Sequence, residues 1–514
     1  MSEKRSARRH IIVCCALIII LIISLIPIFL IAGYDCASGD DYNYGARSHL
    51  AFIATGSVLE AIKAAFSTTA TTWESWQGTW FDCFVFSLHP EVFSDTAYVI
   101  VPYIFVSMQI VCFLFFAHHF LKIKWKLGDY YWLEVGLIFL IFVFQLVPSQ
   151  KSAIFWWVGS VHYAMPMCMT VVGIVLADNF LAEHKVRDLV GLTVIATLLG
   201  GATYPAIILM TLAIILLSLE KVVIGRKRDK KDCFLLFPFG LEMIGFVISA
   251  VAPGNAVRSA SDIAGGAKPS GGALATILKS IVFSAQDALG CFIAEKTFVL
   301  IAVIMIVILT VFVLSGAENK DEIKEIFSHP GLFVLVMFLL NASVYAPRLY
   351  AGGEVSSGYY NFNFWTFFVC LISSCIYLVS FCYFKLDKQK NMPFIKMAAY
   401  AAACIGVILI AFVGRHGVKA YTDYICMNYY LSGQADDYKE QMKLQRMLMT
   451  EEGIEDVVVP AVNDLQGPLM QMPIVGDPQN IDNRMAASFY GKKSCRAIPR
   501  QEWIAKYGDK YNIN

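Results

Sequence analysis

Two adjacent carboxylates, Asp40 and Asp41, follow the first long apolar run of the chain and precede Tyr42-Asn43-Tyr44. A carboxylate at the mouth of a membrane helix can take a proton from a hydroxyl as a general base, or orient a cation. The same residues also suit a solvated loop whose Asp side chains hydrogen-bond to their own backbone. The pair is therefore a candidate catalytic site, with an ordinary turn as the alternative.

Three tryptophans stand within eight residues further along, at Trp73, Trp76 and Trp80. Trp is enriched at membrane interfaces as an anchor, which explains the cluster without any ligand. Aromatic faces also stack on sugar rings, and the side chains between the tryptophans can hydrogen-bond to hydroxyl groups. The predicted sugar or acceptor contacts are Glu74, Trp76, Gln77 and Trp80.

The elements that must position these residues are membrane helices. Hydrophobic residues make up 57% of the 514 and charged residues only 16%, whereas a soluble domain is about a quarter charged. The net charge of +1 gives no excess of positive charge to attract nucleic acid, so we predict no nucleic-acid partner. Eleven apolar runs suit membrane crossings, although the fifth and ninth are short for one. They lie at about 11–31, 97–120, 130–147, 163–181, 189–201, 204–219, 233–251, 297–314, 331–345, 364–384 and 397–413.

Basic residues orient this predicted all-α, polytopic bundle. The first run is too long for the core of a cleaved signal peptide, so we expect a retained helix. The N-terminus and the loops on its side of the membrane carry 21 Lys and Arg, and the opposite loops carry 8. The positive-inside rule then places the N-terminus in the cytoplasm and the C-terminus outside.

This orientation places two long loops, at about 32–96 and 252–296, and the tail outside the membrane. We expect a transmembrane domain over 1–413 and an extracytoplasmic domain over 414–514. An amphipathic stretch, from Val58 to Phe66, predicts a helix lying in the membrane interface. In the tail, a helix at 436–449, a strand at 457–460 and a helix at 483–490 predict a small α/β appendage.

The layout of the first outer loop resembles the GT-C class of integral-membrane glycosyltransferases. More closely, the chain resembles an uncharacterised bacterial family of multispanning proteins related to O-antigen glucosyltransferases. The resemblance covers nearly the whole chain. It is carried by Gly39-Asp40-Asp41-Tyr42, Trp76-Gln77-Gly78, Ala252-Pro253-Gly254-Asn255 with Arg258, Ala346-Pro347-Arg348 and Asn483-Arg484-Met485-Ala486…Phe489-Tyr490-Gly491.

The resemblance implies transfer of a sugar from a polyprenyl-phosphate donor to an extracytoplasmic cell-envelope acceptor, at a bacterial plasma membrane. It also implies that an acidic residue of the first outer loop is catalytic, without deciding between Asp40 and Asp41. The donor phosphate needs cations at the outer interface. The candidates are Arg258, Arg348 and Lys151, while His162 joins the predicted acceptor contacts; helix-end cations also snorkel to lipid head groups without other function.

Two other classes of function remain open. A transporter or flippase of lipid-linked saccharides would use a buried acid, and Glu242 lies near the middle of the seventh run. A non-catalytic envelope assembly protein is the third interpretation. A polymerase or ligase acting on the same substrates would be a near neighbour of the transferase.

The cysteines indicate no metal site. The 14 Cys form neither a C-x-x-C motif nor a Cys/His cluster, so zinc is not indicated. We predict no cofactor, while leaving a divalent metal open. Two pairs of cysteines on the predicted outer side, Cys36 with Cys83 and Cys426 with Cys495, could form disulfides, but the sequence does not decide whether they do.

Overall fold

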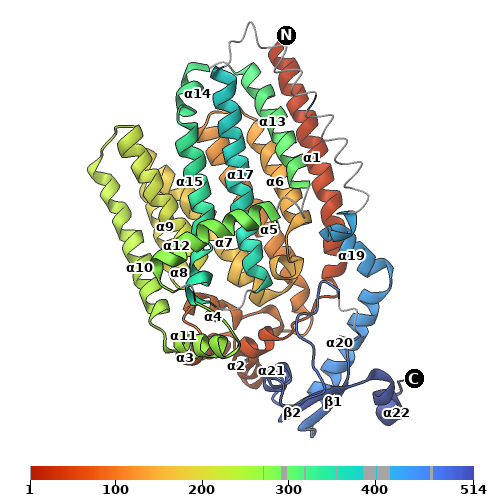
Figure 1. The fold of residues 1–514 in the computed structure, drawn as a ribbon. Helices are drawn as coiled ribbons and strands as arrows, with labels where there is room; N and C mark the ends of the chain where they lie inside the picture. Colours follow the sequence, from red (N-terminus) through yellow and green to blue (C-terminus); the bar gives the residue numbers. More distant parts are fainter. Residues whose placement is uncertain are drawn as a thin grey trace.

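A computed structural model of the protein describes residues 2–269, 271–290, 298–317, 320–352, 356–385, 401, 417–463 and 467–513. Most of these residues are helical, and most of the long helices run along one axis as a bundle (Figure 1). The long helices are α1 (Ser2–Ala32), α5 (Val101–Ala117) with η3 (His118–Lys124), α6 (Tyr131–Leu146), α7 (Trp157–Glu183), α8 (Val186–Leu199), α9 (Tyr204–Leu219) with η5 (Glu220–Ile224), α10 (Leu236–Ala250), α13 (Phe298–Gly316), α15 (Pro330–Ser343) and α17 (Ser357–Lys385).

Seven helices in the described part of the chain are long and apolar enough to cross a membrane, or eight if the bent pair α14 (Lys320–Ile326) and α15 forms one span. The 51° bend of this pair falls at a break before Pro330. The predicted third and fifth runs form α6 and α8, which have 16 and 14 residues and are short for a full crossing. The predicted run at 397–413 lies outside the described residues, except for residue 401.

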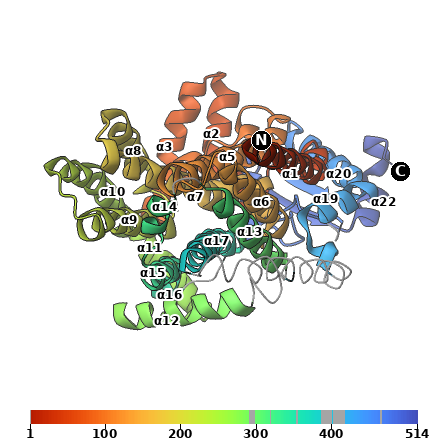
Figure 2. The same ribbon diagram turned by 90° about the horizontal axis from the view of Figure 1, so that it is seen from above.

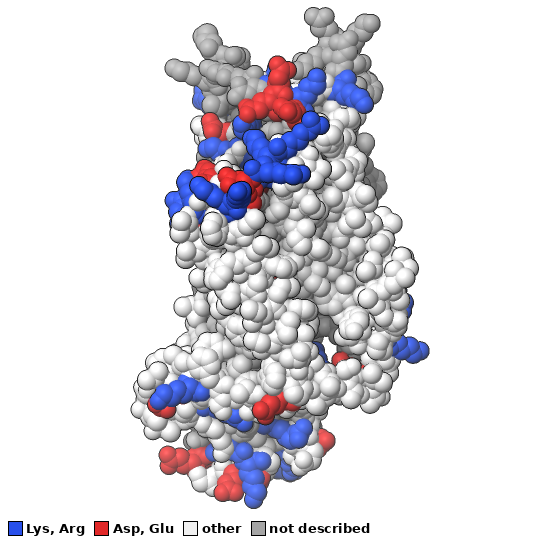
Figure 3. Space-filling view, turned by 90° about the vertical axis from the view of Figure 1, so that its left-hand side faces the viewer, with Lys and Arg blue, Asp and Glu red and all other residues white. Residues whose placement is uncertain are grey.

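Charged side chains gather at the two ends of the bundle. On the face shown in Figure 3, a broad belt almost free of Lys, Arg, Asp and Glu separates the two charged zones. Such a belt matches the hydrocarbon layer of a bilayer, where charged side chains are costly. The chain is therefore a helical, multi-pass membrane protein.

Short helices cover the end of the bundle that lies opposite the N-terminus, which we call the site end (Figure 1). The helices α2 (Asp40–Thr55) and α3 (Val58–Ser75) form an antiparallel pair beside α4 (Trp80–Phe86), and α11 (Pro253–Ala264) packs on α3. The amphipathic stretch predicted from Val58 indeed begins α3, whose Ser57 side chain accepts a hydrogen bond from the Glu60 backbone N–H. Ser at this position satisfies a free donor of the first helical turn.

The C-terminal segment adds a small α/β unit at the site end. Strands β1 (Asp456–Pro460) and β2 (Ser494–Ile498) pair in parallel, with Asp456 opposite Ser494. The connecting segment contains α21 (Ile481–Phe489), and α20 (Gln434–Thr450) and α22 (Arg500–Tyr511) flank β1. These elements confirm the helix, strand and helix predicted for the tail.

One further helix lies across the others. Seen from above, α12 (Ala273–Asp287) lies along the outside of the bundle (Figure 2), next to α15 and α16 (Ala346–Ala351). Its small polar residues Thr276, Ser280 and Ser284 are buried, whereas Leu274 and Leu278 are exposed. An apolar outer face on a transverse helix suits contact with lipid.

Candidate active site

Asp40 begins α2 and is the partly exposed member of the carboxylate pair. The preceding residue, Gly39, has φ of 56°, a left-handed conformation that favours glycine. Burial, with a further contribution from the nearby Asp482 carboxylate, raises the pKa of Asp40 to about 6, while Arg258 and His162 oppose this rise. A carboxyl group with a pKa near 6 is ionised at neutral pH yet basic enough to take a proton.

Asp41 is completely buried and its oxygens are engaged. Its Oδ2 accepts hydrogen bonds from the Tyr98 hydroxyl at 2.6 Å and the Ser38 N–H at 3.2 Å, and its Oδ1 accepts from the Val158 N–H at 3.1 Å. Burial raises the pKa of Asp41 to about 7, against the opposing effect of these donors. Asp41 therefore ties the start of α2 to the turn that precedes α5 and to the start of α7.

A third carboxylate, Asp82, lies buried on α4 and was missed in the sequence. Its Oδ2 is 2.6 Å from His162 Nδ1 on α7, whereas its Oδ1 has no hydrogen-bond partner among the described residues. Burial raises the pKa of Asp82 to about 6, with His162 opposing this effect. Because His162 also acts electrostatically on Asp40, the Asp82–His162 pair forms a second polar centre beside Asp40.

Arg258 is held against the tryptophan loop. Its Nη1 donates to Gln77 Oε1 at 2.7 Å, and its guanidinium lies 5.6 Å from the ring centre of Trp76. Gln77 is buried, while Trp76 is 41% exposed, so the indole can also meet a ligand. A guanidinium on an aromatic face keeps most of its donors free for phosphate oxygens.

The Pro-Gly-Asn turn explains how Arg258 reaches this loop. Pro253 begins α11, where its missing N–H costs nothing. A Cβ at Gly254 would stand 2.4 Å from the Trp76 backbone nitrogen, so only glycine allows this approach. The Asn255 side chain accepts from the Gly78 N–H at 3.0 Å and donates to the Ser249 carbonyl at 2.7 Å.

The other two predicted phosphate ligands have different surroundings. The Arg348 guanidinium lies 5.9 Å from the ring centre of Tyr359 and close to Asp287, where it opposes the rise in pKa that burial causes. The Lys151 ammonium donates to the carbonyl of Met470, and burial lowers the pKa of Lys151. Neither cation is among the charges that act on Asp40, so of the three only Arg258 shares its site.

The C-terminal unit closes one side of the site. The Gln471 N–H donates to the Ser38 hydroxyl at 3.2 Å, and Met472 packs so closely on Gly39 that a Cβ there would lie 2.7 Å away. Asp482, the second residue of α21, is the carboxylate that raises the pKa of Asp40. Residues more than 400 positions apart in the sequence therefore meet at the start of α2.

Aromatic rings join α21 to α2. Phe489 stacks on His49 at 4.0 Å, and its ring centre lies 4.9 Å from that of Tyr42. Asn483 fixes the other side of α21, because its amide donates to the carbonyls of Val475, Asp477 and Cys495 and accepts from the Val475 N–H. Asn483 and Phe489, which belong to the Asn-Arg-Met and Phe-Tyr-Gly patterns of the tail, therefore have structural parts in the fold.

The remaining predicted contacts divide into packed and exposed residues. Trp80 donates to the Gly245 carbonyl at 3.3 Å and packs on Gly201, so its indole holds α4 against α8 and α10. Glu74 is exposed on α3. The residues that sequence reasoning missed, Asp82 and Asp482, stand alone in apolar or mixed surroundings and gave no motif.

The cysteines of the two outer pairs, for which the sequence left disulfide formation open, are unpaired in the structure. Cys36, Cys83, Cys426 and Cys495 are all free thiols, so neither disulfide forms. Burial raises the pKa of the Cys36 and Cys83 thiols to about 12, which keeps them protonated. Among the residues that the structure describes, no three His, Cys, Asp or Glu side chains converge as metal ligands.

Comparison of the chain with models of protein families, with curated proteins and with solved structures gave no significant match.

Proposed function

We propose that this protein is an integral-membrane glycosyltransferase of the GT-C type, which moves a sugar from a polyprenyl-phosphate donor to an extracytoplasmic cell-envelope acceptor. The observation that carries the proposal is the grouping of Asp40, Arg258 and the Asp82–His162 pair at one end of the bundle. A base with a pKa of about 6 beside a guanidinium suits the transfer of a sugar from a phosphate leaving group.

In this mechanism Asp40 takes the proton of an acceptor hydroxyl. The hydroxyl oxygen then attacks the anomeric carbon of the donor, and the bond from that carbon to the phosphate oxygen breaks with inversion. Arg258 neutralises the negative charge that develops on the departing polyprenyl phosphate. Gln77 and Trp76 hold the guanidinium in place, so little reorganisation is needed during the reaction.

Asp41 is assigned a structural part and Asp40 the catalytic one, since the hydrogen-bond donors that the pair has among the described residues all converge on Asp41. The Asp82–His162 pair supplies a second donor or acceptor for the hydroxyl groups of the sugar. His162 thus keeps its predicted place as a sugar or acceptor contact.

A transporter is the second candidate, and Glu242 is the observation that favours it. This residue is buried on α10, beside Thr211 of α9, and its Oε1 has no hydrogen-bond partner in the described part of the chain. Among the described residues Glu242 has no charged partner, and a single acid does not make a chain of groups along which a proton could move. Glu242 therefore supports transport less well than the Asp40 cluster supports transfer.

The two candidates differ in the bond that is broken. The purified chain in liposomes, given a polyprenyl-phosphate sugar and cell-envelope glycan, should release free polyprenyl phosphate and extend the glycan. Glu242→Gln should retain this activity. Movement of the intact donor across the bilayer without release of phosphate, lost in Glu242→Gln, would instead establish transport. If neither transfer nor transport is observed, an assembly role is the remaining candidate.

The proposed mechanism needs the site end outside the cell. A reporter that works only outside the membrane, fused after Asn514, should be active, because basic residues concentrate on the side of the N-terminus. A reporter that works only in the cytoplasm should be inactive there. The opposite pattern would place the site in the cytoplasm and refute the assignment of donor and acceptor.

A further inference from the structure

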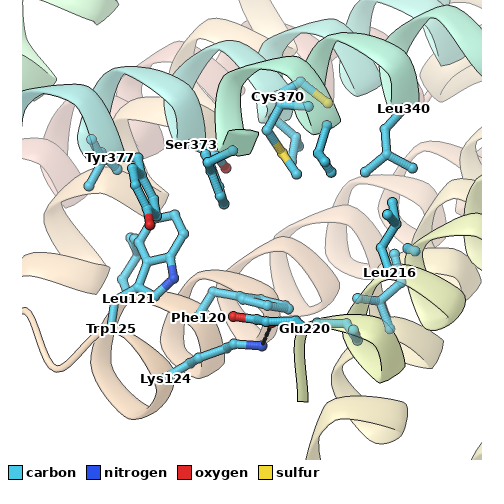
Figure 4. A pocket seen from close by; sticks show the side chains of 18 of the residues that line it. Phe120, Leu121, Lys124, Trp125, Leu216, Glu220, Leu340, Cys370, Ser373 and Tyr377 are labelled. Carbon is cyan, nitrogen blue, oxygen red and sulfur yellow. Dashed lines mark hydrogen bonds and ion pairs between the residues drawn. The ribbon is translucent and has the colours of Figure 1, made fainter. Parts of the chain in front are cut away.

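A cavity lies within the bundle, toward the end that carries the N-terminus. Its volume is about 860 Å³, within the range of about 300–1,000 Å³ that is usual for ligand pockets. Side chains from α5, η3, α6, α7, α9, η5, α14, α15 and α17 line it, and most of them are apolar (Figure 4). Phe120, Leu216, Leu340 and Cys370 are typical of the wall.

The cavity opens between η5 and α15. Leu219, Val223 and Leu332 line it and are themselves 50%, 66% and 53% exposed, so this wall is interrupted at the surface of the bundle. Water is a poor occupant of a space with so few polar groups, and an empty cavity of this size would be costly. In a membrane helix bundle, the material available at such an opening is lipid hydrocarbon.

Charges mark one end of the cavity. Lys124 Nζ donates to Asp178 Oδ1 at 2.7 Å and to Glu220 Oε2 at 2.8 Å, and Lys126 pairs with Glu322. Lys124 ends η3 and Glu220 begins η5; both segments are π-helical, a form that is frequent at functional sites. The wider turns bring these two charges together at the rim (Figure 4).

The charges of the rim indicate the head group. The described lining contributes three carboxylates, from Glu220, Glu322 and Glu325, and two ammonium groups, from Lys124 and Lys126. Glu325 is exposed and joins no ion pair among the described residues. A head group with only negative charge would meet an excess of carboxylates, whereas one with both a phosphate and an ammonium group has partners for each.

We propose that this cavity binds one chain of a zwitterionic, ammonium-bearing phospholipid such as phosphatidylethanolamine, from the leaflet at the N-terminal end of the bundle. The phosphate lies toward Lys124 and Lys126, and the ammonium group lies toward Glu325. The site is separate from Asp40 and does not depend on sugar transfer. Its occupant is a structural lipid, distinct from any donor whose phosphate would bind at the site end.

The first test measures which lipid stays with the protein. The full chain, purified in mild detergent from membranes that contain both phosphatidylethanolamine and phosphatidylglycerol, should retain phosphatidylethanolamine in native mass spectra. Ser373→Trp places an indole in the cavity and should abolish this retention. Leu378→Trp is the matched control on the same helix, because Leu378 is 40% exposed and does not line the cavity.

The second test changes the head-group preference. Glu325→Lys gives the rim an excess of positive charge and should shift the retained lipid toward phosphatidylglycerol, while Glu452→Lys on the C-terminal unit should not. An unchanged lipid in Glu325→Lys would overturn the head-group assignment. Retention of a polyprenyl lipid, or of none, by the wild-type chain would overturn the proposal, and the sugar-transfer assay would be unaffected by either result.

Discussion

Replacing Arg258 with alanine removes a cation that, alone among the described residues, both contacts the tryptophan loop and acts on Asp40. Hydrogen bonds to a charged group contribute about 1.5–3 kcal/mol, and every 1.4 kcal/mol is about a factor of ten in affinity. Loss of the phosphate contact should therefore weaken donor binding by about 10-fold to 150-fold. Binding of a polyprenyl-phosphate sugar to the purified variant measures this effect directly.

The same substitution should also change the pH profile. Arg258 opposes the rise in the pKa of Asp40, so Arg258→Ala should raise that pKa above about 6. Because the base works only when ionised, the acidic limb of the pH–rate profile, where the transfer rate falls as pH decreases, should move to higher pH. A purely structural part for Arg258 would lower the rate at every pH without moving the limb.

Two variants serve as controls. Arg258→Lys retains the charge, so the limb should stay near its wild-type position, while affinity falls because the Gln77 bond and the Trp76 stack depend on a guanidinium. Arg348→Ala should leave the limb in place, since Arg348 lies beside Tyr359 and Asp287. Wild-type donor affinity together with an unmoved limb in Arg258→Ala would refute the reasoning.

The remaining predictions concern the C-terminal unit. Asp482→Asn should lower the pKa of Asp40 and move the acidic limb of the pH–rate profile to lower pH, opposite to Arg258→Ala. An unmoved limb would show that Asp482 does not act on Asp40. Asn483→Ala leaves several buried backbone groups unpaired and should destabilise the unit by about 3 kcal/mol, measured by thermal unfolding and limited proteolysis. Lys151→Met should weaken donor binding less than Arg258→Ala, because Lys151 is already bound to a C-terminal carbonyl; an equal loss would restore it as a phosphate ligand.

Much of the architecture follows from the order of residues. Long apolar runs must become helices in a bilayer, which satisfies every backbone donor and acceptor within the segment. The predicted helices at 11–31, 97–120, 163–181 and 364–384 are present, as is the amphipathic helix that begins at Val58. The predicted count of eleven spans stays a prediction, because α6 and α8 are short and the last run is not described.

The site itself was predicted only in part. Asp40 and Asp41 are neighbours in the sequence, but successive residues of a helix point about 100° apart. Because α2 packs against α3, α21 and α4, tertiary contacts decide that Asp41 is fully buried and Asp40 partly exposed, and the residue types alone do not show this. Arg258 was predicted at the site, and its two partners in the tryptophan loop, Trp76 and Gln77, were predicted as ligand contacts.

Tertiary contacts explain the residues that were missed. Asp82 became recognisable only when α4 packed against α7 and brought it to His162. Asp482 reaches Asp40 because α21 packs on α2 through aromatic rings. Neither residue belongs to a motif with fixed spacing, so no local pattern in the sequence identifies them.

The most direct test of Asp40 as the general base compares the two carboxylates of the pair. Asp40→Asn retains shape but loses basicity, and should lower the transfer rate by roughly 100-fold or more while donor affinity changes little. Asp41→Asn should instead lower thermal stability, since Asp41 accepts three buried hydrogen bonds, and its folded fraction should remain active. Full transfer activity in Asp40→Asn would contradict the account, whatever the result at Asp41.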